Sequence, residues 1–232
     1  MTTTAIPRSA TVRSLPILRL AGIVGALAAT AMALLWAPPD SVQGEVQRIM
    51  YVHVPSAWIA FLAFFVVCLA SVGWLWTRRW IFDAIAVASA EIGVLLTGLT
   101  LVAGSLWAKP TWGVWWTWEP RLLTTAVMFV MYVGYLLLRS LSPDPERRAT
   151  RAAVVGIVAV VNVPIVHLSV TWMNALHQLP SVLRPGGPAL DDRMLATLLV
   201  GVAAFSLIYA WLMVERVAIE SARQTRLLEA SR

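Results

Sequence analysis

The sequence has few charged residues, which make up 13% of its 232 residues, whereas hydrophobic residues make up 59%. A typical soluble domain carries about 25% charged residues, most of them at its surface. This shortage excludes an ordinary soluble globular domain. It also sets aside the usual estimate of domain number from chain length, because a bilayer and not a water-excluding core would determine the architecture.

Cysteine is almost absent too. The one cysteine, Cys68, cannot form an internal disulfide, no C-x-x-C motif occurs, and its place in an apolar run indicates a packing residue. The formal charge of +6 comes from basic residues that are scattered between apolar runs. This scatter argues against a nucleic-acid partner and favours loops beside an anionic lipid leaflet.

Long apolar runs are what the sequence does contain. Because a helix rises 1.5 Å per residue, about 20 apolar residues cross the hydrocarbon core of a bilayer. Six segments qualify, at residues 15–36, 56–77, 84–106, 122–138, 152–172 and 194–214, and only Arg19 and Glu91 place a charge well inside them. The sequence predicts an all-α membrane protein: a single domain over residues 1–232 with six transmembrane helices whose neighbours are antiparallel.

The basic residues are divided unequally between the two sides of these spans. Of the 18 arginines and lysines, 13 lie in the termini and the even-numbered loops. The other side holds only Arg48, Lys109, Arg121, Arg184 and Arg193. The positive-inside rule therefore predicts that both termini are cytoplasmic, with residues 215–232 as a cytoplasmic tail. The first, third and fifth loops then face the periplasm of a bacterial inner membrane.

These three outward loops hold histidines and a tryptophan cluster. His53 lies just before the second predicted helix, and His177 lies in the fifth loop. Five of the 12 tryptophans occur in the third loop, residues 107–121, and they are Trp107, Trp112, Trp115, Trp116 and Trp118. An interfacial aromatic belt explains one or two rings per helix end. The alternative is a flat aromatic platform for a large planar ligand.

A porphyrin fits this set of side chains. Neutral imidazole is an axial ligand of haem iron, and a second histidine can take the opposite face. The haem propionates need cations, and four basic side chains lie on the same side: Arg48, Arg121, Arg184 and Lys109. From these residues alone, haem binding and a purely structural role for the two histidines both remain open.

Two motifs carry a family resemblance. Residues 112–122, WGVWWTWEPRL, resemble the tryptophan-rich "WWD" signature of haem-handling proteins in cytochrome c maturation. Residues 48–55, RIMYVHVP, and residues 162–178, NVPIVHLSVTWMNALHQ, are similar to the C component of the system I pathway, the haem exporter protein C family. The similarity extends over nearly the whole chain, including its six spans, its loop order and its length.

The resemblance implies function as well as fold. It implies a protein that is not an enzyme, binds haem b non-covalently with His53 and His177 as axial ligands, and passes it to a periplasmic, membrane-anchored haem chaperone. Further implied partners are ATP-binding-cassette subunits and a small single-span subunit. Trp112, Trp115, Trp116 and Trp118 match the platform and Arg121 the basic residue after it. Glu119 and Pro120 depart from the usual aspartate and alanine, which lengthens the carboxylate and removes a backbone donor.

Two residues inside the spans call for separate interpretation. His167 precedes His177 by ten residues, which is 15 Å along a continuous helix, so we expect it to bond another helix or a backbone carbonyl and not to share an iron with His177. Glu91 lies too far below the outward loops to reach a ligand there. An intramembrane carboxylate suggests function, and we expect a protonated or water-bonded group between helices, or a contact with a partner subunit.

Two other functions are compatible with parts of the sequence. A single-haem, b-type electron-transfer subunit needs fewer histidines than a di-haem subunit, which would require four at membrane depth, whereas the chain has three. A permease or scaffold without a cofactor would not need the tryptophan loop. The sequence contains no G-x-x-x-x-G-K-[ST] motif, so this chain is not expected to hydrolyse ATP itself.

Overall fold

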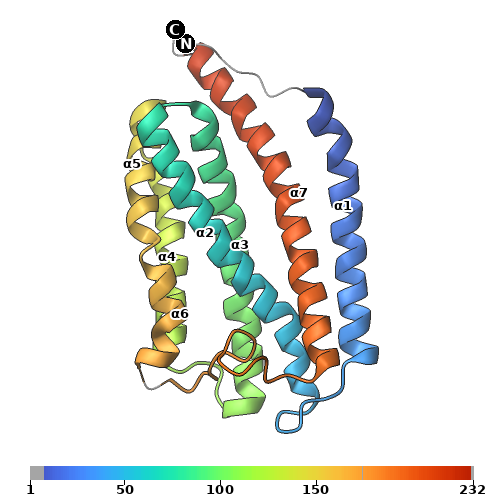
Figure 1. Ribbon diagram of the computed structural model, residues 1–232. Helices are drawn as coiled ribbons and strands as arrows, with labels where there is room; N and C mark the ends of the chain where they lie inside the picture. Colours follow the sequence, from blue (N-terminus) through green and yellow to red (C-terminus); the bar gives the residue numbers. More distant parts are fainter. Residues whose placement is uncertain (1–7, 174, 231–232) are drawn as a thin grey trace.

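The computed structural model describes residues 8–173 and 175–230. These residues form α-helices that run up and down beside one another (Figure 1). The helices are α1 (Arg8–Ala31), α2 (Met50–Thr77), α3 (Trp80–Trp112), α4 (Pro120–Ser140), α5 (Pro145–Ala159), α6 (Asn162–Trp172) and α7 (Asp192–Ala230). A π-helical turn (Met32–Trp36) extends α1, and a 3-10 turn (Glu45–Ile49) leads into α2.

Six stretches of this structure are long and apolar enough to cross a membrane, as predicted. The first, Leu15–Trp36, has the predicted bounds, and α5 and α6 together form the fifth. The other five are longer than predicted, because a helix continues past the apolar core wherever it still satisfies its own backbone. Their ends carry ordinary stop and start signals: Gly113 ends α3 with φ of 79°, and Glu119 and Asp144 cap α4 and α5 just before prolines.

The bundle has two distinct ends (Figure 1). At one end, here called the terminal end, α1 begins, α7 ends and short links join α2 to α3 and α4 to α5. At the other, here called the histidine end, lie the connections 37–49, 113–119 and 173–191. The assignment of the histidine end to the periplasm, and of residues 215–232 to a cytoplasmic tail, stays a prediction. Within the described chain, α7 continues without a break to Ala230.

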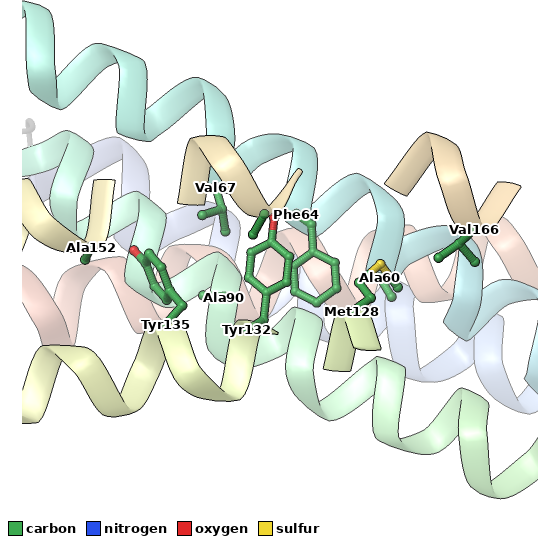
Figure 2. Packing of buried hydrophobic residues seen from close by; sticks show 10 residues of the cluster. Ala60, Phe64, Val67, Ala90, Met128, Tyr132, Tyr135, Ala152 and Val166 are labelled. Atoms are coloured by element: carbon green, nitrogen blue, oxygen red, sulfur yellow. The ribbon is translucent and has the colours of Figure 1, made fainter. Parts of the chain in front are cut away.

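The apolar core lies where α2, α3, α4 and α5 meet (Figure 2). Phe64 on α2 stacks on Tyr132 on α4 with ring centroids 3.6 Å apart and planes at 12°. Gly93 on α3 makes this possible, since a Cβ there would lie 2.6 Å from the Phe64 ring. Met128 and Val166 belong to the same cluster on its side toward the histidine end, and their side chains also line a cavity. The core therefore forms the floor of that cavity.

A buried charged cluster ties the helices together at the terminal end. Arg139 on α4 donates to both carboxylate oxygens of Asp83 on α3, at 2.6 and 2.8 Å. Gln224 on α7 donates to the same carboxylate at 2.7 Å, and Glu220 lies 3.9 Å from Arg139. Asp83 and Arg139 fall just outside the predicted spans 84–106 and 122–138, so the sequence did not predict this cluster.

Glu91 pairs with an arginine of the same chain, which corrects the prediction of a protonated or water-bonded carboxyl group or a contact with a partner subunit. Arg216 on α7 donates to its carboxylate through Nε at 2.8 Å. The predicted sixth span ended at residue 214, so Arg216 was counted in the tail, whereas α7 carries it alongside α3. Glu91 on α3 and Arg216 on α7 thus form an ion pair that links two helices of the same chain.

Candidate functional site

His53 lies on a helix, which corrects the prediction that it precedes the second helix in a loop. The predicted second span begins at residue 56, directly after Pro55, and a proline is favoured at the start of a helix. In the structure α2 already begins at Met50. Pro55 therefore sits inside α2, where it cannot donate to the Tyr51 carbonyl. His53 is consequently held on a rigid element, with its ring at a fixed position in the bundle.

The His53 ring packs against the backbone of α3 at Gly104. A Cβ added at Gly104 would lie 3.0 Å from His53 Cε1 and 3.4 Å from Nδ1, which is closer than ordinary van der Waals contact. One turn further along α3, Trp107 meets the same imidazole edge-on, with ring centroids 5.8 Å apart. Because Gly104 has no side chain, the His53 ring can pack directly on α3, and the indole of Trp107 fixes its orientation from the side.

His177 faces His53 from the connection between α6 and α7. The two ring centroids are 6.3 Å apart and the ring planes are inclined at 30°. A metal–imidazole bond is about 2.0 Å long and the ring centre lies about 1 Å further, so two imidazoles on opposite sides of one metal have centroids about 6 Å apart. The pair therefore has the spacing of two axial ligands. In the described residues, no group of three or more metal-ligating side chains accompanies it.

His177 is kept neutral by its surroundings. Burial, and after it the positive charge of Arg121, lowers the pKa of its imidazole from 6.5 to about 4. Trp112, in the last turn of α3, covers one side of this ring, with centroids 6.2 Å apart and planes at 73°. A neutral imidazole is the form that coordinates metals. At neutral pH, His177 therefore does not need to lose a proton before it coordinates a metal ion.

The two histidines line a cavity of about 350 Å³ at the histidine end. Its walls come from α2, α3, α4, α6 and the 173–191 connection, and they are mostly apolar. A volume of this size is in the range of small-molecule and cofactor sites. On α2 the lining extends from His53 to Phe61, which is about 12 Å of helix rise. The cavity therefore continues well below the histidine pair into the depth of the bundle.

The predicted tryptophan platform divides into two groups. The predicted loop 107–121 is shorter than expected, because α3 runs to Trp112 and only 113–119 is irregular. Trp107, Trp112 and Trp116 line the cavity. Trp115 and Trp118 lie outside its lining and are 55% and 79% exposed. Three indoles thus contact the cavity space, and the other two present an aromatic outer surface.

The predicted polar residues also divide. Arg121 lines the cavity and donates to the His167 carbonyl at 2.8 Å. Arg48 does not line it: its guanidinium bonds the Ala33 and Ala37 carbonyls at the end of the first span and pairs with Glu45. Arg48 therefore caps a helix end.

Glu119 and Lys109 have local roles as well. Glu119 Oε1 accepts from the Leu122 N–H at 2.8 Å, and this carboxylate caps α4. Pro120 follows at the first helical position, where its missing donor is harmless. Lys109 donates to the Gly113 carbonyl and lies over Trp115. These contacts shape the 113–119 segment, and neither residue lines the cavity.

Several buried polar atoms around the cavity have no hydrogen-bond partner among the described residues. They are His53 Nδ1, His177 Nδ1, Trp116 Nε1 and Arg121 Nε on residues that line the cavity, and Thr117 Oγ1 and Glu119 Oε2 in the neighbouring 113–119 segment. A buried polar atom without a partner costs about 1–3 kcal/mol, so native proteins seldom retain a group of them. Such a group beside a cavity indicates a site that a polar or metal-containing ligand completes.

Two residues of the site were not found from the sequence. Gln43, in the 37–44 connection, lines the cavity and accepts from Trp107 Nε1 at 2.6 Å. Gly104 makes room for His53. Neither carries a local signal, because a single glutamine in a loop or a glycine in an apolar helix is common. His167 lines the same cavity; its carbonyl bonds Arg121, and no bond from its imidazole is found in the part of the chain that the structure describes.

Comparisons with known proteins agree with this architecture. A family model described as Heme exporter protein C matches residues 2–230. The chain is 39% identical over 226 residues to "Heme exporter protein C" of Bradyrhizobium diazoefficiens, covering 96% of this chain and 86% of the relative. It is 38% identical to the protein of the same name in Haemophilus influenzae, covering 81% and 76%. A 38% identical relative in Marchantia polymorpha, covering 76% of each chain, is a "Putative cytochrome c biosynthesis ccmC-like mitochondrial protein". The chain belongs to the heme exporter protein C family.

Proposed function

We propose that this protein binds haem at the histidine end between His53 and His177 and delivers it to a haem chaperone during cytochrome c maturation. Membership of the family implies haem handling in that process. The observation that carries the proposal is the histidine pair itself. Two imidazoles lie 6.3 Å apart between centroids, and each has a buried Nδ1 without a partner among the described residues.

The rest of the cavity suits the other parts of a porphyrin. Trp107, Trp112 and Trp116 offer aromatic faces and edges to a flat ring. Arg121 uses one nitrogen on a backbone carbonyl and keeps Nε buried and unpaired, so it has a donor left for a propionate carboxylate. The deeper wall, from Ala57 to Phe61 on α2, is apolar and suits the edge of the ring that bears no carboxylates.

Haem is the cargo here, and the site is built for reversible binding. His53 is fixed on a helix, whereas His177 belongs to an irregular connection of about twenty residues between α6 and α7. Release of one axial ligand therefore requires movement of a connection and leaves the helices in place. Trp115 and Trp118 flank Trp116, which lines the cavity, and their indoles are exposed. They provide a surface on which a chaperone can receive the haem.

The proposal includes the cellular setting. The histidine end faces the periplasm of a bacterial inner membrane, and the terminal end faces the cytoplasm, where ATP-binding-cassette subunits join the complex. A small single-span subunit completes it. The charge distribution supports this orientation, because the sequence assigns 13 of the 18 basic residues to the side of the termini.

Absorption spectroscopy of the purified protein tests the ligand assignment. We expect His53→Ala and His177→Ala each to abolish most of the Soret band of bound haem, because one axial ligand is lost. His167→Ala serves as the matched control: it removes an imidazole that lines the same cavity, and the Soret band should remain. Unchanged haem content in both of the first two variants would refute the assignment.

A further inference from the structure

The seam between α2 and α6 differs from the other walls of the cavity. α2 packs along α3, α3 packs along α4, and α4 packs along α6, where Asn162 also donates to the Thr124 carbonyl. By contrast, α2 packs extensively on α5 and makes little backbone contact with α6, although Val166 of α6 joins Ala60 of α2 in the apolar core. The fifth span breaks at residues 160–161, between α5 and α6. On the terminal-end side of the break, α5 lies against α2. On the histidine-end side, α6 makes little contact with α2 beyond Val166.

Two residues on the borders of this seam belong to the cavity and also to the outer face of the bundle. On α2, Trp58 is 49% exposed and lies in a stripe with Leu62, Phe65, Leu69 and Val72, which are all exposed. On α6, His167 is exposed and lies in a stripe with Val161 and Pro164. A stripe of exposed apolar residues at helical spacing on a membrane span faces lipid. Yet Trp58 and His167 both line the cavity, so the cavity opens sideways to the bilayer between them.

The side of the cavity that faces the terminal end is closed by packing. Toward the terminal end, the floor of the cavity is Ala60, Met128 and Val166. Directly behind this floor lies the stack of Phe64 on Tyr132 (Figure 2). Both rings are fully buried, so a large planar molecule cannot pass through the core from the terminal end. Exposed residues that line the cavity lie at the histidine end and at the α2–α6 seam, so these are the two sides on which the described structure leaves it accessible.

We propose that haem enters the cavity laterally from the membrane leaflet at the histidine end, through a portal bordered by Trp58 and His167. This inference rests on the proposed function. Haem is a flat amphiphile with one apolar edge, so it partitions into a bilayer and can slide between two helices edge first. The bilayer is its source, and the opening at the histidine end serves for its release.

His167 has a defined role at this portal. An ionisable side chain on a lipid-facing position is costly and marks a functional site. Its imidazole has no bonding partner in the described structure, and its own carbonyl holds Arg121 at the cavity wall. It is therefore placed to coordinate incoming haem transiently, before the iron reaches the pair of His53 and His177. His167 is a loading residue and not a ligand of the final complex.

A kinetic experiment in lipid nanodiscs tests the portal. The native Cys68 is replaced by serine, and a single cysteine is placed either at the portal (Trp58→Cys) or at a control position (Phe65→Cys). Phe65 lies two turns away on the same face of α2, is 53% exposed and does not line the cavity. Each variant is reacted with a bulky maleimide and mixed with haem-loaded vesicles, and the rise of the bound-haem Soret band is followed.

We expect modification at residue 58 to slow loading from vesicles several-fold, with little effect at residue 65. Loading from haem dissolved in the aqueous phase through the histidine end should be slowed much less at either position. Equal rates for the two modified variants, or equal slowing of both, would overturn the portal.

His167→Leu should slow vesicle loading and leave the final spectrum unchanged, and an unchanged rate would overturn its loading role. Failure of the proposed function itself would look different, because no variant and no wild-type protein would develop the Soret band.

Discussion

The two ends of this bundle both bury polar side chains, but they satisfy them differently. At the terminal end, both oxygens of Asp83 are occupied by donors from Arg139 and Gln224. At the histidine end, Nδ1 of His53, Nδ1 of His177 and Nε of Arg121 are buried without a partner in the described structure. Away from the histidine end, Arg148 Nε and Nη2, Ser71 Oγ and the hydroxyls of Tyr132 and Tyr135 also lack partners among the described residues, but none of these residues lines the cavity.

This difference is the one expected between a structural polar cluster and a ligand-binding site. A buried charge that is paired by three helices holds those helices together and gains nothing from a ligand. Buried donors and acceptors left unpaired beside a cavity keep a free-energy cost that a ligand can remove. In this protein, residue type alone does not identify the candidate site, whereas unpaired buried polar atoms on residues that line a cavity do mark it.

Removing Arg139 should produce the largest effect. Arg139→Met leaves the Asp83 carboxylate buried without its main partner, and loss of one member of a buried pair costs about 3–5 kcal/mol. We expect a strongly lowered thermal unfolding temperature in detergent. Arg147→Met is the matched control, since Arg147 is 74% exposed and pairs only with Asp144, and such pairs contribute about 0–1 kcal/mol. Equal stability of the two variants would mean that the cluster is not structural.

Acid should act at the histidine end before it acts on the fold. Burial lowers the pKa of His177 from 6.5 to about 4, so the unfolded or undocked form binds a proton more readily than the buried form. The stabilisation from the neutral, buried ring is therefore complete above about pH 6.5 and is lost as the pH falls toward 4. Haem occupancy measured against pH should be constant at neutral pH and fall in that window. Full occupancy at pH values below 4 would contradict the assignment of His177.

A methyl group at Gly104 should weaken the site without disturbing the bundle. In Gly104→Ala the new Cβ lies 3.0 Å from His53 Cε1 and pushes the imidazole off its position. A displaced rotamer costs about 0.5–1.5 kcal/mol, which corresponds to roughly two- to tenfold in haem affinity. Gly98→Ala, two turns away on the same helix, is the control because its Cβ would meet Phe129 at an ordinary 3.5 Å. A titration with haem that gave the same dissociation constant for both variants would remove Gly104 from the site.

Gln43 should have the smallest effect of the four. Gln43→Leu removes the acceptor of the Trp107 N–H bond, and loss of one neutral hydrogen bond costs about 1 kcal/mol. We expect a few-fold weaker haem binding and an unchanged unfolding temperature. Val42→Ala, at a neighbouring residue that is 90% exposed, should bind haem like the wild type. The same haem titration checks both variants, and wild-type affinity for Gln43→Leu would show that Trp107 does not need this bond.

The sequence predicted the architecture well and the details of the site only in part. Hydropathy identifies all six spans, because an apolar bilayer leaves a chain little choice but helices. It did not place His53 on α2, since Pro55 resembles a helix start and the helix begins five residues earlier. It also did not pair Glu91 with Arg216, because the partners are 125 residues apart.

The site residues illustrate the same limit. His53, His177, Trp107, Trp112, Trp116 and Arg121 were selected by residue type, and they do line one cavity. Trp115, Trp118, Glu119 and Arg48 were selected on the same grounds and lie outside it. Which side of a turn a tryptophan faces depends on helix ends such as Gly113, and composition does not determine them. The need for glycine at position 104 is evident only from the packing of α2 on α3, because any side chain there would contact the His53 ring.

The most direct measurement of the central claim is the spin state of the bound iron in ligand variants, with and without added imidazole. Haem held by His53 and His177 should be six-coordinate and low-spin in both absorption and electron paramagnetic resonance spectra. His53→Gly and His177→Gly should each become five-coordinate and high-spin, and exogenous imidazole in the vacated space should restore the low-spin spectrum. A low-spin, six-coordinate iron that persists in both variants without imidazole would contradict the assignment of these two histidines as the axial pair.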